Sequence, residues 1–362
     1  MMSFAQWGNA LYAGDKSYKI VPRRKLFVGV AAALVAVSLV LLAVFGLNRS
    51  IEFTGGSQFD VAHVAEQTES VASTAVASTG LASDVKVTKV GSDGIRVQTA
   101  SLNSKDTATV RQALAEAYSV DDTDVQSSSI GPSWGSSVTQ KALQSLVIFL
   151  ALVALLMTVY FRSWTMAASA LLALVHDMAV TLAVFVITQV EVSPATIIGF
   201  LTILGYSLYD TVVVFDKVRE LTSDLTEQKR YTFAEYVNLA VNQTMVRSIN
   251  TSVVAILPVA AILVIAWLLL GTGTLTDISL ALFVGMVAGT YSSIFIASPL
   301  LVMFEDRKKR VKEHNAIVAS SRGVQGKGDE AEAESTPVRV APIRPGKRLS
   351  NAHQPSRKKK SQ

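Results

Sequence analysis

The sequence of 362 residues contains no cysteine, which excludes a disulfide framework, a thiolate metal site and a cysteine nucleophile. Charged residues are also scarce: they make up 17% of the chain, whereas a soluble globular domain carries about 25%. Half of the residues are hydrophobic. The chain is therefore too apolar for a purely soluble enzyme, and too apolar to be disordered over most of its length.

The apolar residues are concentrated in segments long enough to cross a hydrocarbon core of about 30 Å as helices. There are six of them: Leu26–Leu47, Ala142–Phe161, Thr165–Thr188, Val192–Phe215, Ser248–Gly271 and Ile278–Phe304. Only two of their residues, Asp177 and Asp210, have an acidic or basic side chain other than histidine. One such segment would be compatible with a buried helix of a large soluble protein, but six together predict a polytopic α-helical membrane protein.

Lysine and arginine gather on one side of the predicted spans. They precede the first span, separate the second from the third and the fourth from the fifth, and follow the sixth, whereas the loops Gln189–Glu191 and Thr272–Asp277 have none. The positive-inside rule then predicts a multi-pass protein of the cytoplasmic membrane with both termini in the cytoplasm. The first span has a basic start like a signal peptide, but its length and the lack of a small-x-small cleavage site predict an uncleaved anchor.

Residues 48–140 form the one large soluble insert, which we expect on the outer side of the membrane. Their pattern predicts strand, helix, strand, strand, helix, strand, the order of a ferredoxin-like α+β domain. The Ala, Ser, Thr and Val content of the first helix leaves its assignment open. The predicted elements are Ser57–Val61, Val64–Thr79, Val85–Val90, Ile95–Ala100, Ser104–Tyr118 and Val125–Ile130.

The C-terminal residues 305–362 carry 15 Lys and Arg against 7 Asp and Glu, with little apolar periodicity. This composition predicts a disordered basic cytoplasmic tail. Its charge suits anionic lipid or ribosomal RNA as a partner, and a solvated retention segment without a partner is equally compatible.

Ionisable side chains inside a span usually face the bundle interior and mark an ion or substrate pathway. Asp177 lies near the middle of the third span, directly after His176. Asp210 lies about 9 Å from the inner end of the fourth span, with Tyr206 one turn before it. Arg247 precedes the fifth span at a similar depth, which predicts a pair between Asp210 and Arg247.

Structural interpretations of the same residues stay open. Asp177 could be held by hydroxyl or backbone groups of a neighbouring helix. Asp210 could be a static part of the bundle while Arg247 extends to the lipid headgroups. Depth alone would place Asp177 ahead of Asp210 as the functional acid.

Two further patterns indicate structural roles. Gly285 and Gly289 form a small-xxx-small motif, extended by Ser292, Ser293 and Ser298, which predicts close helix packing. Residues 231–237 predict a short helix on the membrane surface, followed by a loop at Asn238–Gln243. No phosphate-binding loop, zinc-ligand spacing or Ser/His/Asp arrangement occurs, so we expect no enzymatic activity, no metal and no cofactor other than protons.

Six motifs, in order along residues 25–304, resemble the SecF family of the bacterial Sec translocase, within the resistance-nodulation-division superfamily. The first holds Phe53, Thr54, Gly55 and Gly56, and the fourth begins at Gly205. The motifs are Ile51–Gly56, Gly131–Ser133, His176–Asp177, Gly205–Asp210 with Val212–Glu220, Gln243–Arg247 with Thr251–Ser252, and Gly289–Ser293 with Ala297–Pro299.

The resemblance implies a subunit that works with SecD and the SecYEG channel, using the proton-motive force to complete the export of preproteins on the outer side. In SecF proteins, the aspartate of the Gly-Tyr-Ser-x-x-Asp motif and the arginine at the start of the fifth span are regarded as proton-pathway residues. They fall on Asp210 and Arg247 here. Tyr209 departs from the asparagine common in the family and alters the polarity beside Asp210.

The sequence thus predicts a proton pathway through Asp210, Arg247 and Asp177, with His176, Tyr206, Ser207 and Thr251 as supporting polar groups. Six spans with one outer domain resemble half of a twelve-span transporter, so a homologous partner half is expected besides membrane lipids. Two alternatives remain: half of a small-molecule or lipid exporter of the same superfamily, and a scaffold that transports nothing.

Overall fold

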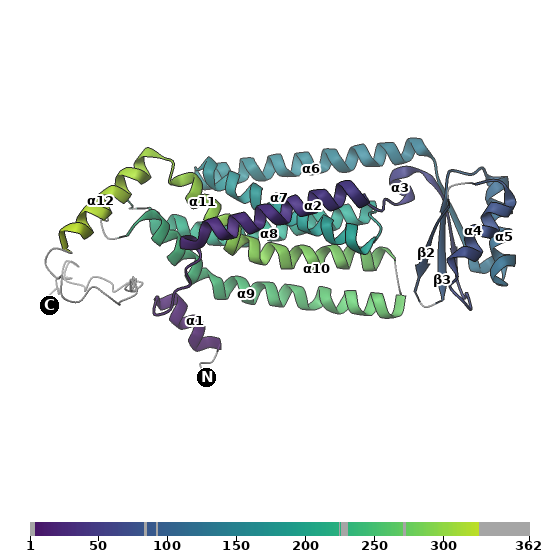
Figure 1. The fold of residues 1–362 in the computed structure, drawn as a ribbon, viewed down its shortest axis with the longest axis horizontal. Coiled ribbons are helices and arrows are strands. Elements are labelled where there is room, and N and C mark those ends of the chain that lie inside the picture. Colours follow the sequence, from purple (N-terminus) through teal and green to yellow (C-terminus); the bar gives the residue numbers. More distant parts are fainter. Residues whose placement is uncertain are drawn as a thin grey trace, which may run out of the picture.

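The computed structural model describes most of the chain, namely residues 4–82, 85–91, 93–223, 225, 231–270 and 273–325. Within these residues, six helices are long and apolar enough to span a membrane, as predicted. Figure 1 shows them in one elongated bundle, with a sheet domain at one end and helices α1 and α12 at the other. Both described chain ends therefore lie on the side of the bundle opposite the sheet domain.

Most helices of the bundle are longer than the apolar segments that predicted them. α6, for example, begins at Pro132 rather than at Ala142, because proline needs no hydrogen bond for its nitrogen in the first turn of a helix. The bounds are α2 Arg24–Phe45 after the 3-10 turn η1 Val21–Arg23, α6 Pro132–Phe161, α7 Trp164–Thr188, α8 Pro194–Thr222, α9 Phe233–Ile265 with the π turn η3 Ala266–Leu270, and α10 Thr274–Ser292 with the π turn η4 Ser293–Ala297 and α11 Ser298–Glu305.

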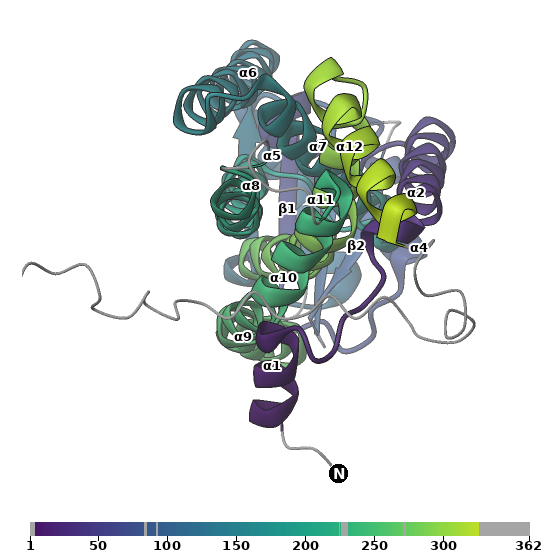
Figure 2. The ribbon, with the colours of Figure 1, turned by 90° about the vertical axis from the view of Figure 1, so that its left-hand side faces the viewer.

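The bundle has a central and a peripheral set of helices. The most apolar windows of α7, α8 and α10 are 44%, 50% and 56% buried, whereas those of α2, α6 and α9 are 11% buried. Figure 2 looks along the bundle and shows α10 in the middle, with α7, α8 and α9 around it. The three central helices are the ones that can hold polar groups away from lipid.

Two glycines let α10 approach α8 closely. A Cβ atom at Gly285 would lie 2.3 Å from Cγ2 of Ile203, and one at Gly289 would lie 2.8 Å from Cβ of Ser207. No side chain fits at such distances, so the predicted packing role of the Gly-xxx-Gly motif is confirmed. The contact brings Ser207 of α8 against α10, where the buried polar groups gather.

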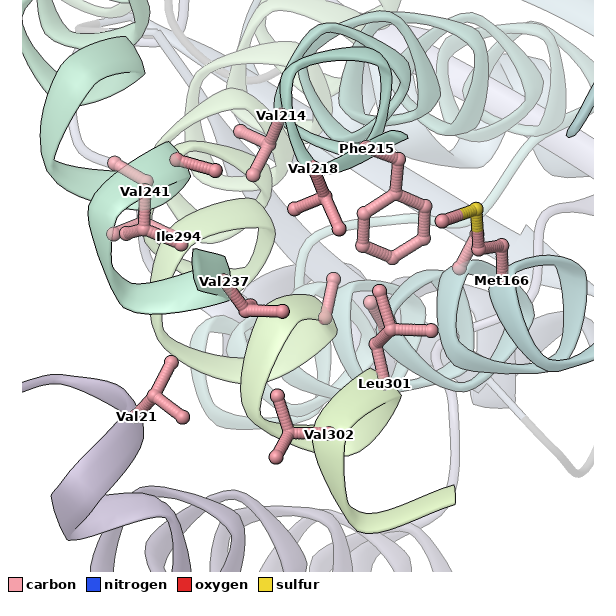
Figure 3. Close-up of a cluster of buried hydrophobic side chains, with 14 of the residues drawn as sticks. Val21, Met166, Val214, Phe215, Val218, Val237, Val241, Ile294, Leu301 and Val302 are labelled. Atoms are coloured by element: carbon pink, nitrogen blue, oxygen red, sulfur yellow. The ribbon is translucent and has the colours of Figure 1, made fainter. Parts of the chain in front are cut away.

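An apolar cluster closes the bundle at the end that carries α1 and α12. Phe215 and Val218 of α8 meet Val237 of α9 and Leu301 of α11 there. Figure 3 shows this cluster, with Val21 at its edge. The cluster fixes the N-terminal segment before α2 against α9 and α11.

The outer insert has the predicted ferredoxin-like element order. Its sheet has four strands in the order β2-β3-β1-β4, and every neighbouring pair is antiparallel. The two helices supply Val76 and Leu114 to an apolar core with Phe59, Ile95 and Val97 of the strands. The elements are β1 Gly56–Val61, α4 Glu69–Thr79, β2 Val85–Val90, β3 Gly94–Thr99, α5 Ser104–Tyr118 and β4 Val125–Ile130.

The first helix of this domain is shorter than predicted. α4 begins at Glu69, not at Val64: the chain turns at His63, where φ is 55°, and is still extended at Thr68, the N-cap residue of the helix. Val64 is 4% exposed and belongs to the apolar core. Its burial, and not a helical turn, explains its place in the apolar pattern.

The prediction of a separate surface helix at 231–237 and a loop at Asn238–Gln243 is wrong. α9 runs without interruption from Phe233, with a capping box between Thr232 and Glu235. The amides of Asn238 and Asn242 stay inside the helix because they bind the N-terminal segment. Asn238 Oδ1 accepts hydrogen bonds from the backbone nitrogens of Ile20 and Val21, at 3.0 and 3.1 Å.

Both described termini contain helices that the sequence did not predict: α1 Phe4–Ala13 and α12 Lys309–Gln325. The predicted disorder of the tail is therefore wrong for α12. Its one buried face consists of Val311, His314 and Val318, and His314 Nε2 lies 2.8 Å from the carbonyl oxygen of Tyr231. This stripe is too short to stand out among the surrounding charges. The rest of the predicted tail, 326–362, lies outside the described residues.

Candidate functional site

Asp177 is a completely buried carboxylate between three helices. It lies on α7 and is 0% exposed. Its Oδ2 atom accepts hydrogen bonds from Ser207 of α8 at 2.5 Å and from Ser292 of α10 at 2.8 Å. Because both hydroxyls come from other helices, Asp177 joins the three central helices of the bundle.

His176 extends this group of polar side chains. Its Nδ1 atom lies 3.2 Å from Asp177 Oδ1, and its Nε2 atom lies 3.0 Å from the hydroxyl of Tyr291 on α10. The rings of His176 and Tyr291 meet edge to face, with centroids 5.4 Å apart. Helical geometry places residues 176 and 177 about 100° apart, so each contacts a different neighbour while their side chains still touch.

Asp210 occupies a second buried position, on α8 one turn beyond Ser207. It is 5% exposed, and Ser293 Oγ donates a hydrogen bond to its Oδ2 atom. Ser248 of α9 lies beside the same carboxylate. The two aspartates are therefore connected through consecutive residues of one helix, because Ser292 contacts Asp177 and Ser293 contacts Asp210.

The two serines lie where the sixth span changes its helical geometry. α10 ends at Ser292, and the π turn η4 begins at Ser293. Pro299 explains the change, because it has no N–H for the carbonyl group one turn earlier and its ring displaces that carbonyl. Single π turns inside α-helices often mark functional sites.

Arg247 lies well inside α9, not at its start, and its side chain is exposed. It is close enough to Asp210 for a coulombic interaction. The predicted direct pair is nevertheless wrong, since no ion pair within 4.0 Å joins these two described residues.

Of the other predicted residues, Tyr206 lies near buried polar groups, whereas Thr251 and Gly205 do not belong to the buried site. Tyr206 lies beside Ser252 of α9, whose Oγ accepts a hydrogen bond from Thr290 at 2.8 Å. Thr251, which the sequence favoured over Ser252, is only half-buried. Gly205 contributes nothing to the buried site: a Cβ atom there would have no neighbour within 4 Å. It shares an exposed face of α8 with Tyr209, which is 53% exposed.

The predicted motif around Phe53 and Thr54 lies where the outer domain joins the bundle. Gly55 and Gly56 have φ angles of 72° and 144°, which favour glycine. A Cβ atom at Gly55 would lie 2.8 Å from Cα of Pro132, at the start of α6. The strand that enters the outer domain and the helix that leaves it therefore meet at this motif.

A second contact joins the outer domain to the loop between α7 and α8. Arg96 of β3 lies 2.7 Å from Asp60 and 3.1 Å from Glu191. Burial alone would lower the pKa of Arg96, but the hydrogen bonds and charges of these two carboxylates outweigh it and raise that pKa. Gln98 Nε2 donates to Glu191 at 2.8 Å. Burial also lowers the pKa of Lys86, which contacts Asn48.

Sequence analysis missed the residues of this contact, among them Asp277 of the sixth span. It lies in the first turn of α10, is 6% exposed, and interacts electrostatically with Glu191 and Arg96. The sequence placed it in an outer loop, where an acidic residue raises no question. Because Asp277 and Ser292 are on the same helix, α10 extends from the outer contact to the buried aspartates.

Known proteins share this architecture and these motifs. A profile of the C-terminal part of SecD/SecF protein export membrane proteins matches residues 109–307, and the SecD/SecF GG motif matches residues 40–62. Protein translocase subunit SecF of Streptomyces coelicolor is 41% identical over 92% of this chain and 89% of its own length. SecF of Mycobacterium tuberculosis is 42% identical over 86% of this chain and 72% of its own length.

The chain belongs to the SecD/SecF family. Solved structures agree: the crystal structure of SecDF from Thermus thermophilus is 28% identical, with a TM-score of 0.72 over 81% of this chain. SecDF in its super-membrane-facing form gives a TM-score of 0.59 at 27% identity. This chain covers only 39% and 40% of those two chains, so it corresponds to less than half of a SecDF protein.

Proposed function

We propose that this multi-pass membrane protein is the SecF-type subunit of a Sec protein translocase, which uses the proton-motive force together with a SecD partner to complete protein export. The relatives are named as protein translocase subunits, and SecDF relatives join SecD and SecF in one protein. These names do not favour the alternative of a small-molecule or lipid exporter. The SecYEG channel, the preprotein and a cytoplasmic position of both termini belong to the same proposal.

The observation that carries the proton step is the position of Asp210. It is a buried acid that accepts a hydrogen bond from Ser293, with Ser248 beside it and an arginine nearby but not in contact. Protonation would remove its charge, weaken its attraction to Arg247 and change its hydrogen bond with Ser293. Asp177, with hydrogen bonds from two helices, supports a different role at the fixed end of the same polar network.

We propose that α10 transmits this change to the outer domain. Ser293 begins a π turn, which can be exchanged for α-helical geometry by a small shift along the helix axis. At the other end of α10, Asp277 lies beside the contact between Arg96 and Glu191. One charge that crosses 100 mV releases about 2.3 kcal/mol, enough to shift a modest conformational equilibrium.

The test is Asp210→Asn in membrane vesicles that export a preprotein under an imposed proton-motive force. We expect export to fall to the level of vesicles that lack the protein, while the variant still co-purifies with its SecD partner. Asp216→Asn is the matched control, because Asp216 is on the same helix but exposed. Undiminished export by a partner-competent Asp210→Asn protein would overturn the proton step, and failure to co-purify with any SecD-type partner would overturn the assignment as a translocase subunit.

A further inference from the structure

A large cavity lies at the end of the bundle opposite the outer domain. It has a volume of about 1060 Å³ and lies between the segment that leads into α2 and the first turns of α9. Four basic side chains line it: Lys19, Arg23, Arg24 and Lys25. None of them is part of the buried aspartate site.

The charge in this cavity is not balanced by the protein. Arg24 is paired with Asp306 at 2.8 Å. The acidic wall residue Glu235 is paired with Arg322, whose Nη1 and Nη2 atoms donate hydrogen bonds to it at 3.0 and 2.8 Å. In contrast, Lys19, Arg23 and Lys25 are exposed and form no ion pair with any described residue. Asp15 is the one other acid of the lining, so positive charge is in excess.

The wall of the cavity is held in a fixed position. Val21, in the middle of the basic segment, is 1% exposed and packs into the apolar cluster of Figure 3. Its backbone nitrogen donates to Asn238 Oδ1 at 3.1 Å. Because the apolar contact of Val21 and its hydrogen bond both hold the backbone of this segment in place, the basic side chains start from fixed positions. This lowers the entropic cost of binding a ligand.

An apolar track leads from the cavity along α2. Leu26 belongs to the cavity lining and is 60% exposed. Val30, Leu34 and Val37 follow it on the same face of the helix, and they are 52%, 41% and 55% exposed. The track points from the charged end into the membrane, parallel to the direction of lipid chains.

We infer that this cavity binds an anionic phospholipid, with its phosphate group at Lys19, Arg23 and Lys25 and one acyl chain along the Leu26–Val37 face of α2. Basic pockets at membrane helices are suited to such headgroups. A soluble phosphate ion would share the headgroup contacts, but it would not use the apolar track. A basic segment needed only for orientation in the membrane would not require the cavity.

The test measures lipid binding to the full chain, purified with its co-purifying partner, by native mass spectrometry during titration with phosphatidylglycerol. Arg23→Gln/Lys25→Gln should bind phosphatidylglycerol about twenty-fivefold more weakly, because each of the two basic residues near an anionic headgroup contributes about fivefold. Arg310→Gln/Lys312→Gln is the matched control: it removes the same charge from exposed positions of α12 outside the cavity and should change nothing.

Three outcomes would overturn the inference: equal weakening in both double variants, equally tight binding of phosphatidylcholine, or binding of inorganic phosphate as tight as that of the lipid. Because loss of basic residues can also disturb membrane insertion, Ala234→Trp provides a second variant. It fills the cavity without changing charge and should weaken binding as well. Unaltered binding to a correctly inserted Ala234→Trp protein would place the lipid elsewhere.

Discussion

The outer domain and the membrane bundle differ in what they bury at their centres. The outer domain buries Phe59, Ile95, Val97 and Leu114 at 0% exposure. The bundle has a buried apolar cluster too, but it also buries Asp177 and its two serine partners, while many leucine and valine side chains of α2, α6 and α9 face outward. Water favours the first arrangement and lipid permits the second, because burial of apolar side chains gains little when the surroundings are apolar too.

The difference shows what holds each part together. Apolar burial drives the folding of the outer domain, whereas the bundle relies on packing contacts, close backbone approach and hydrogen bonds between hydroxyl groups and carboxylates. The two parts meet at the Gly55–Pro132 contact and at the ion pair between Arg96 and Glu191. Substitutions in each part should therefore have different effects.

The largest effect on stability is expected in the outer core. Leu114→Ala should destabilise the outer domain by about 2–5 kcal/mol, because it removes a buried side chain and leaves a cavity. Urea unfolding followed by fluorescence of a label in α5 measures this. Leu81→Ala, at a position 37% exposed, should cost far less. Equal costs for the two variants would contradict an apolar core in this domain.

In the bundle, a single added methyl group between α8 and α10 should lower the stability. Gly289→Ala places a Cβ atom 2.8 Å from that of Ser207 and should cost about 1–3 kcal/mol, lowering the melting temperature in detergent. Gly205→Ala adds the same atom to the same kind of helix but meets nothing within 4 Å. This control should be neutral or slightly stabilising. If both variants melt alike, close packing of α8 and α10 is not what holds the bundle.

The smallest effect on stability is expected from a substitution at the contact between the outer domain and the bundle. Arg96→Gln removes an ion pair that is 20% exposed at Arg96 and 14% at Glu191, while Gln98 still holds Glu191. We expect a loss of about 1 kcal/mol. Hydrogen exchange at Val192, whose amide donates to Asn48, should rise about fivefold. Arg111→Gln, which breaks the exposed pair with Asp122, should leave that exchange unchanged, and a rise there would contradict a local contact.

The sequence predicts most of the fold because lipid and water impose simple patterns. Long apolar runs revealed the six spans, and alternation revealed the four strands. The start of α9 was missed because Asn238 and Asn242 are typical of loops. Their amides are satisfied by residues 18–21, which are more than 200 positions away, and no local pattern reports that contact.

The sequence predicted which acidic residues form the candidate site, but not which side chains they contact. Asp177 and Asp210 stood out as isolated acids in apolar spans. Ser207 was predicted as a supporting polar group, but Ser292 and Ser293 were assigned to a packing face, because a hydrogen bond between helices does not alter the residue spacing within either helix. The predicted contact between Asp210 and Arg247 failed for the same reason: matched depth does not determine which way a side chain points.

The central claim is that Asp210 exchanges protons while Asp177 stays fixed in its hydrogen bonds. Infrared difference spectroscopy of the reconstituted protein, stepped between acid and alkaline buffer, tests it most directly through the C=O band of a protonated carboxyl group. We predict a band that is lost in Asp210→Asn and retained in Asp177→Asn and Asp216→Asn. A band unchanged in Asp210→Asn, or lost only in Asp177→Asn, would contradict the account.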